Sequence, residues 1–184
     1  DAVTLSGLTN KMEVTYSADG TNWISQMPTV TNVSDSKEIH VKIAVTGTSE
    51  VYVTKLNVVV NPASIVDQTF KLSSDTVYWS KNCKKPTVSS DSLVKDKDYT
   101  VSYPAKYNMV GLQVVTIKGI GNYTDSKQLA YVVSIKKGAT YVVAGYKYKV
   151  LSSAKVAIVG ASAKSKKKIV VKNTVTIGGK VCKI

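Results

Sequence analysis

The chain has 184 residues, with 25 lysines, no arginine, 12 acidic residues and a formal net charge of +13. This length allows one to three small domains, and no apolar run approaches the roughly 18 residues of a membrane-spanning helix. Arginine is the usual reader of guanine edges and the usual bidentate phosphate ligand, so its absence argues against sequence-specific nucleic-acid recognition.

Strand-forming residues dominate the composition. Val, Ile and Thr make up nearly a third of the chain, eleven residues are Tyr, and no stretch has apolar residues at helical spacing across three turns. We therefore expect an all-β protein built from small antiparallel sandwich modules.

The first module is expected at residues 1–62. Apolar residues alternate at 12–16 and 39–45, with His40 and Lys42 on the opposite face, and Asp19-Gly20 supplies a turn before Trp23. A last strand is predicted over 56–60, since Pro62 cannot continue it.

The second module is expected at residues 63–135, with short strands near 70–72, 77–79 and 84–88. Its most regular part contains three β-type runs, at 99–103, 110–118 and 129–135. The glycines at 119 and 121 end the second run, because glycine tolerates turn conformations.

The third module is a small Lys-rich β module at residues 136–184. It contains twelve lysines and no acidic residue, whereas residues 1–62 contain four lysines and six acids. We expect strands at 141–143, 146–150, 155–159, 169–171, 175–177 and 181–184. A unit of this size is marginal alone, so it should pack against the second module. Its charge favours attraction to a polyanion such as an anionic cell-wall polymer.

Three motifs carry a resemblance to surface repeats of Gram-positive bacteria. The segments DYTVSY (98–103), VG (110–111) and VTIKGIGNYT (115–124) resemble the closing strands of immunoglobulin-like repeats in secreted and cell-surface proteins of clostridial type. More loosely, YSADGTNW (16–23) and TVTIGGKVCKI (174–184) are similar to other repeats of the same bacteria. The resemblance implies tandem immunoglobulin-like modules outside the cell, at the cell surface or in the cell wall, within a larger chain and monomeric.

Catalytic and metal-binding patterns are missing from the sequence. His40 is the one histidine and is expected to be a surface imidazole; one histidine and two distant cysteines do not make a zinc site. No G-x-S-x-G motif occurs, and no helix follows Gly119-Ile-Gly121 to make a dinucleotide loop. We expect no enzyme activity and no cofactor.

Cys83 and Cys182 leave two alternatives open. An extracellular setting permits a disulfide between them, and two buried free thiols fit the sequence equally well.

Aromatic and basic residues are the candidates for binding, because exposed Tyr and Trp stack on sugars or anchor protein interfaces. The candidates are Trp79, Tyr107, Tyr123, Tyr146 and Tyr148, together with the basic connector residues Lys164, Lys166, Lys167 and Lys168.

Two functions remain from different classes. The first is an adhesin-like region that binds a host macromolecule, such as an immunoglobulin or a mucosal glycoprotein. The second is a structural spacer or wall-contacting module, with a carbohydrate-binding accessory of a glycoside hydrolase as a further alternative.

Overall fold

The computed structural model describes residues 5–162 and 172–184, and the protein is all-β over these residues. Apart from strands, the described chain contains one short 3-10 turn, η1 (Val33–Asp35). The chain divides into two compact units, Asp1–Ala63 and Ser64–Ile184. The separation of 63–135 from 136–184 as independent modules stays a prediction. No helix in the described ranges is long and apolar enough to cross a membrane.

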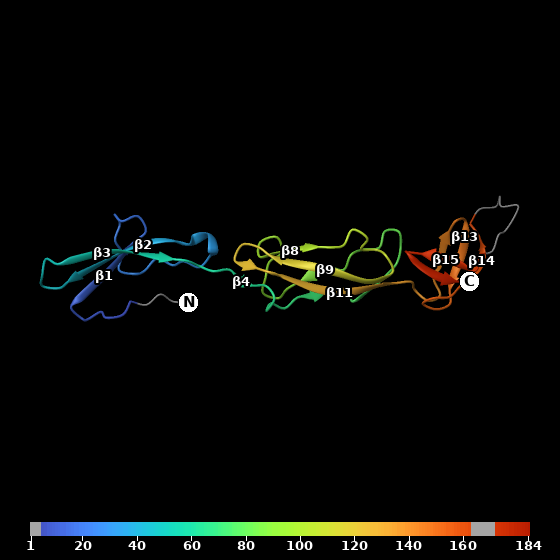
Figure 1. Cartoon of the computed structure of the whole chain (residues 1–184), viewed down its shortest axis with the longest axis horizontal. Helices are drawn as coiled ribbons and strands as arrows, with labels where there is room; N and C mark the ends of the chain where they lie inside the picture. The colour runs from blue at the N-terminus through green and yellow to red at the C-terminus, as the bar shows by residue number, and fades with distance from the viewer. Residues whose placement is uncertain (1–4, 163–171) are drawn as a thin grey trace. The chain divides into compact units, whose positions relative to one another are not determined.

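Unit 1 is built on a three-stranded antiparallel sheet in the order β1-β2-β3 (Figure 1). The strands are β1 (Met12–Ser17), β2 (Lys37–Val45) and β3 (Val51–Val58). The alternation predicted on β2 is confirmed at Ile39 and Val41, which are fully buried, while His40 faces the other side and is half-buried. The last strand begins at Val51, five residues before the predicted start. The prediction missed these five residues because all of them are exposed, so no buried face marks them in the sequence.

The turn after β1 is closed by the carboxylate of Asp19. Its Oδ1 accepts hydrogen bonds from the backbone N–H groups of Thr21 (2.8 Å) and Asn22 (2.9 Å), and from the Ser17 hydroxyl (2.8 Å). Tyr16 and Ile24 then pair as an antiparallel bridge. The predicted turn is therefore confirmed, and one ionised side chain organises it.

Acid should loosen this turn. The backbone N–H of Asn22 is the largest of the hydrogen-bond contributions that hold the pKa of Asp19 well below its usual 3.8. A lowered folded-state pKa adds stability that is fully present above the unfolded value and is lost as pH falls below it. The melting temperature of unit 1 below about pH 4 should therefore fall more steeply in the wild type than in Asp19→Asn, whose amide oxygen accepts the bonds made by Oδ1 without titrating. If the melting temperatures of the wild type and of Asp19→Asn fell in parallel as the pH was lowered, Asp19 would not contribute this stability.

Unit 2 contains a four-stranded sheet in the order β6-β11-β9-β8. Its strands are β6 (Thr76–Tyr78), β8 (Tyr99–Ser102), β9 (Gly111–Gly119) and β11 (Ser126–Ser134). Figure 1 shows β8, β9 and β11 side by side; they are antiparallel neighbours, whereas β6 joins β11 in parallel. The three predicted runs at 99–103, 110–118 and 129–135 are confirmed as strands of this sheet.

Short pairs and a common core complete this part of unit 2. The pairs are β4 (Ala63–Ser64) with β10 (Tyr123–Thr124), and β5 (Lys71–Leu72) with β7 (Val88–Ser89). The core gathers Ile65, Phe70, Leu93, Tyr99 and Ile117, with the Phe70 and Tyr99 rings edge to face at 5.0 Å. Tyr99 of β8 and Ile117 of β9 thus pack the sheet against the segments that carry Ile65, Phe70 and Leu93.

Gly119 is required where β9 ends. A Cβ atom there would lie 2.6 Å from the Thr124 carbonyl oxygen, which is rigid backbone. Gly119→Ala should therefore cost about 1–3 kcal/mol of unfolding free energy in urea, because the neighbouring backbone must shift. Ser126→Ala, on an exposed site of β11, is the control and should stay within about 0.5 kcal/mol of the wild type. If Gly119→Ala and Ser126→Ala were equally stable, the predicted clash between a Cβ atom at position 119 and the Thr124 carbonyl would be contradicted.

The C-terminal part of unit 2 has its own core. A three-stranded sheet contains β12 (Thr140–Val143), β13 (Tyr146–Val150) and β14 (Val156–Ala161), and a hairpin contains β15 (Thr174–Ile177) and β16 (Lys180–Lys183). The core is formed by Ile135, Tyr146, Tyr148, Val150, Val156, Val175, Ile177 and Cys182. Trp79 and Val110, from the preceding part of unit 2, pack against it. The expected packing of residues 136–184 on the preceding strands is therefore present.

Candidate functional site

Tyr146 and Tyr148, two of the predicted binding residues, are largely buried. Both are buried, with 9% and 7% of their surface exposed, and their rings meet edge to face at 6.5 Å. The alternation of β13 sends these two rings inward and Lys147 and Lys149 outward. The prediction that the two tyrosines are exposed is wrong, because alternation on a half-buried strand assigns the apolar side chain to the core.

Trp79 and its neighbour Tyr78 take opposite sides, as expected, but Trp79 is the inward one. The indole of Trp79 lies edge to face with Tyr141 at 5.3 Å and packs on the C-terminal core. Tyr78 is 54% exposed, and the Lys136 ammonium lies 5.6 Å from its ring centre. Trp79 therefore stabilises the fold, and Tyr78 is the exposed aromatic of this pair.

The remaining predicted residues separate into three groups. Tyr123 is half-buried and packs against the core of the four-stranded sheet. Lys164, Lys166, Lys167 and Lys168 lie outside the residues that the structure describes. Tyr107 is half-buried and contacts a lysine, which leads to the site described below.

Cys83 and Cys182 are both buried free thiols, so of the two open alternatives the structure has the unbonded one. Cys182 belongs to the C-terminal core, and burial raises its pKa above the ordinary value, so the thiol stays protonated. The described residues contain no group of three or more His, Cys, Asp or Glu side chains placed to hold a metal ion.

The candidate site is centred on Lys85, whose ammonium lies over two tyrosine rings. Its Nζ is 4.5 Å from the ring centre of Tyr107 and 5.0 Å from that of Tyr103. Lys85 precedes β7, and Tyr103 directly follows β8, so the two strands bring these side chains together. Cation–π contacts of this kind hold an ammonium in place without neutralising its charge.

Hydrogen bonds fix the tyrosine rings beneath Lys85. The Tyr103 hydroxyl donates to the carbonyl oxygen of Pro86, next to Lys85 in the chain. Tyr131, on β11, lies edge to face with Tyr103 at 6.5 Å and donates its hydroxyl to the Tyr107 carbonyl at 3.1 Å. These contacts hold the Tyr103 ring and the backbone of Tyr107, both in the connector between β8 and β9, which favours a preformed surface.

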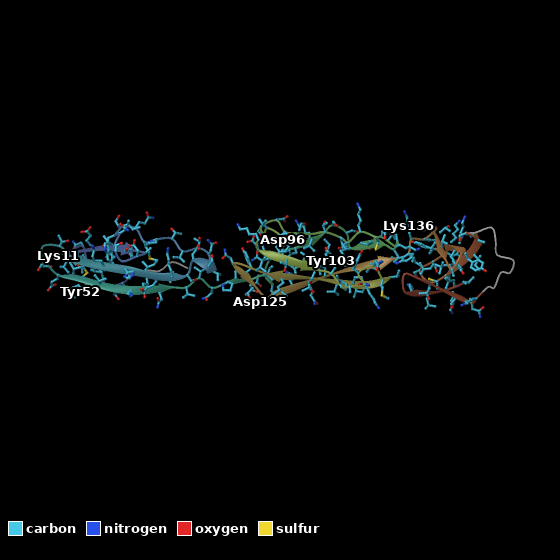
Figure 2. The ribbon with its side chains drawn as sticks, turned by 90° about the horizontal axis from the view of Figure 1, so that it is seen from above. Lys11, Tyr52, Asp96, Tyr103, Asp125 and Lys136 are labelled. Atoms are coloured by element: carbon cyan, nitrogen blue, oxygen red, sulfur yellow. The ribbon has the colours of Figure 1, made fainter. Side chains whose placement is uncertain are left out.

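A groove of about 470 Å³ opens beside Tyr103. It is lined by Lys85, Pro86, Thr87, Val88, Lys95, Val101 and Tyr103, with no acidic residue among them. Figure 2 labels Tyr103 on this part of unit 2, together with Asp96, whose Oδ2 lies 3.1 Å from the Lys95 ammonium. We call this set of lining residues the Lys85–Tyr103 groove.

The tyrosine of the groove is neutral at physiological pH. Desolvation raises the pKa of Tyr103 above its usual 10, and the positive charge of Lys95 opposes part of that rise. The hydroxyl therefore remains a donor, and the only formal charges lining the groove are the two ammonium groups.

This arrangement suits an anionic ligand with an apolar face. The Tyr103 ring, Pro86 and Val101 provide apolar surface in the lining, and Lys85 and Lys95 provide positive charge. Aromatic rings pack against the C–H faces of sugars, and ammonium groups bind carboxylates or sulfates as point charges. The chemistry thus fits a sugar that carries a carboxylate or a sulfate.

A second basic surface lies on the outer face of β13. Lys147 and Lys149 are exposed there. Neither takes part in any of the ion pairs found among the described residues. Residues two apart on a strand are roughly 6.6 Å apart along its axis. These lysines form a short row of uncompensated positive charge.

Sequence reasoning missed Lys85, Lys95 and Tyr103. From the sequence, the run Lys84-Lys85-Pro86 is predicted only as part of a strand, and Tyr103 only as the end of another. Their meeting depends on the pairing of β5 with β7 and of β8 with β9, which no local signal predicts.

Comparisons of the chain with protein-family models, with curated proteins and with solved structures found no match, so the resemblance to immunoglobulin-like surface repeats stays a prediction.

Proposed function

We propose that the chain is a non-catalytic, extracellular binding region of tandem immunoglobulin-like modules that engages host mucosal glycoproteins. Unit 2 would bind an acidic sugar of the glycoprotein through the Lys85–Tyr103 groove. The observation that carries the proposal is the groove itself, in which a fixed tyrosine ring and two ammonium groups line one cavity without an acidic side chain.

Three further features support this reading. The groove has the size of the smaller ligand sites of proteins, which run from roughly 300 to 1,000 Å³. Its aromatic wall is held by hydrogen bonds before any ligand arrives, which lowers the entropic cost of binding. The chain has a net charge of +13, and lysine supplies its basic side chains. This charge attracts acidic partners over a distance of about 8–10 Å at physiological salt.

The test is retention of purified intestinal mucin by the immobilised chain at physiological salt. Mucin would be used untreated, after enzymatic removal of sialic acid, and after removal of sulfate. We expect untreated mucin to be retained and one or both treatments to release it; the arm that does so identifies the acidic group. Serum immunoglobulin is offered in a parallel arm to the wild type and to the groove variants defined below. If both retained it equally, the groove would be refuted as the host-binding site.

A charge-matched pair of variants separates the groove from general attraction. Lys85→Ala with Lys95→Ala removes both ammonium groups of the groove, and Lys106→Ala with Lys118→Ala removes the same charge from exposed sites elsewhere in unit 2. The groove pair should abolish retention and the control pair should leave most of it. Equal losses would show that only net charge matters.

A second function, contact with an anionic cell-wall polymer, is favoured by the row of Lys147 and Lys149. Exposed charge pairs are screened by salt, so retention of wall polymer should fall strongly between about 50 mM and 0.5 M salt. Lys147→Ala with Lys149→Ala should weaken that retention and leave mucin retention unchanged. A polymer interaction that survives both the salt and the variant would contradict this assignment.

A further inference from the structure

The outer strand of unit 1 is an open sheet edge. β3 pairs with β2 on one side only, and in the described chain no strand lies on its other side. Seven of its eight residues are exposed or half-buried, among them Val51, Tyr52 and Val53 at 55%, 60% and 59%. Figure 2 labels Tyr52 on this strand.

β3 has few of the features that usually protect an edge. Its register with β2 runs without a bulge from Lys37 opposite Val58 to Ala44 opposite Val51, and the strand contains no proline. Its one charged residue, Lys55, is paired at 2.8 Å with Glu38 of its own sheet. Long, regular and apolar edges with few charges pair readily with another strand.

The hydrogen-bond pattern shows which backbone groups are available. The N–H of Val45 donates to the carbonyl of Glu50 at 3.1 Å, which makes residues 45 and 50 a directly bonded pair. Bonded pairs recur every second residue in an antiparallel ladder, so Tyr52, Thr54 and Leu56 bond toward β2. The backbone groups of residues 51, 53, 55 and 57 therefore point away from the sheet.

We infer that β3 pairs antiparallel with β3 of a second copy of this chain, around a two-fold axis at Thr54. In this register Val53 of one copy bonds with Lys55 of the other, which uses the outward groups of both strands. Tyr52 of one copy then packs beside Leu56 of the other, an aromatic–aliphatic cross-strand pair. The two Lys55 residues face Val53 rather than each other, so the pairing opposes no like charges.

The interaction is separate from the proposed glycan site. It uses unit 1, whereas the groove belongs to unit 2, so either can fail without the other. It also replaces the expectation of a monomer, which rested on the resemblance to repeats and took no account of an open edge.

The first test is sedimentation equilibrium of the chain over a hundredfold range of concentration. We expect the average mass to rise from monomer toward dimer, and Val53→Pro to remain monomeric. Proline suits this position because the N–H it removes points outward and does not serve β2. Val53→Lys is the second variant, in case proline disturbs folding, which circular dichroism would reveal. A monomer at every concentration, or a dimer that persists in both variants, would overturn the inference.

The register is tested with single cysteines introduced at Thr54 and, as a control, at Glu13 on the opposite edge strand β1. Facing side chains of a non-bonded pair lie near the short end of about 4.5–5.5 Å at Cβ, so a small movement brings two cysteines within the about 3.5–4.5 Å of a disulfide. Oxidised Thr54→Cys should form the linked dimer at least several-fold faster than Glu13→Cys. Mass spectrometry should then identify a disulfide-linked peptide that joins position 54 of one copy to position 54 of the other. Equal rates would contradict the two-fold axis at Thr54.

Discussion

Gly178→Ala should cost unit 2 about 3 kcal/mol of unfolding free energy, the largest single-site effect we expect. A Cβ atom at Gly178 would clash with Nε1 of Trp79 and would lie 2.7 Å from Cγ2 of Val110. The residue also has φ of +58° and accepts a backbone hydrogen bond from Val110 at 2.7 Å, so it cannot easily move away. The measurement is a urea titration followed by far-ultraviolet circular dichroism.

Gly179→Ala is the matched control in the same turn. It has φ of +87°, and its nearest contact would be Cε of Met109 at 2.6 Å, the end of a flexible side chain that can turn aside. It should therefore cost only about 1 kcal/mol, mainly from the backbone conformation. Adding Trp79→Leu should recover part of the loss in Gly178→Ala but none in Gly179→Ala. Equal effects of the two glycine variants would contradict the packing of Trp79 on Gly178.

Tyr103→Ala should weaken mucin retention roughly 30-fold, the size of a binding hot spot. The variant removes the ring that forms one wall of the Lys85–Tyr103 groove and one of the two rings beneath the Lys85 ammonium. Tyr103→Phe keeps the ring and loses only the hydrogen bond to Pro86, so it should retain most of the affinity. Surface plasmon resonance with immobilised mucin measures both.

Tyr78→Ala controls for the loss of an exposed tyrosine elsewhere in unit 2, since Tyr78 lies on β6 away from the lining of the groove. It should bind mucin as the wild type does. If Tyr78→Ala and Tyr103→Ala weakened retention equally, exposed aromatic surface in general would be responsible and not the groove.

Local patterns were sufficient to predict most strands of this protein. Alternation located β8, β9 and β11 in unit 2, and β13 was predicted with its observed bounds. The beginning of β3 was missed because Val51, Tyr52 and Val53 all stay exposed, so apolar and polar positions do not alternate there. Apolar and polar residues alternate along a strand when one of its faces is buried. An open edge strand buries little of either face, so its sequence shows little alternation.

The candidate site was harder to predict, for two physical reasons. The sequence cannot say which side of a strand faces the core when both sides carry large groups, as for Tyr78 and Trp79. It also cannot place together residues whose meeting depends on sheet topology, as for Lys85 and Tyr103. Among the predicted binding residues that the structure describes, Tyr107 is the one whose ring lies beneath Lys85 at the groove.

The most direct test of the proposed function is a nuclear magnetic resonance titration of the isotopically labelled chain with sialyllactose, with a sulfated lactose and with neutral lactose. Binding in the groove predicts saturable amide shifts at residues 85, 87, 88, 95 and 101–103 with one of the acidic sugars, and none with lactose. Shifts confined to the lysines of residues 136–184, shifts of equal size with neutral lactose, or no shifts with any of the three would contradict the assignment of the groove as an acidic-sugar site.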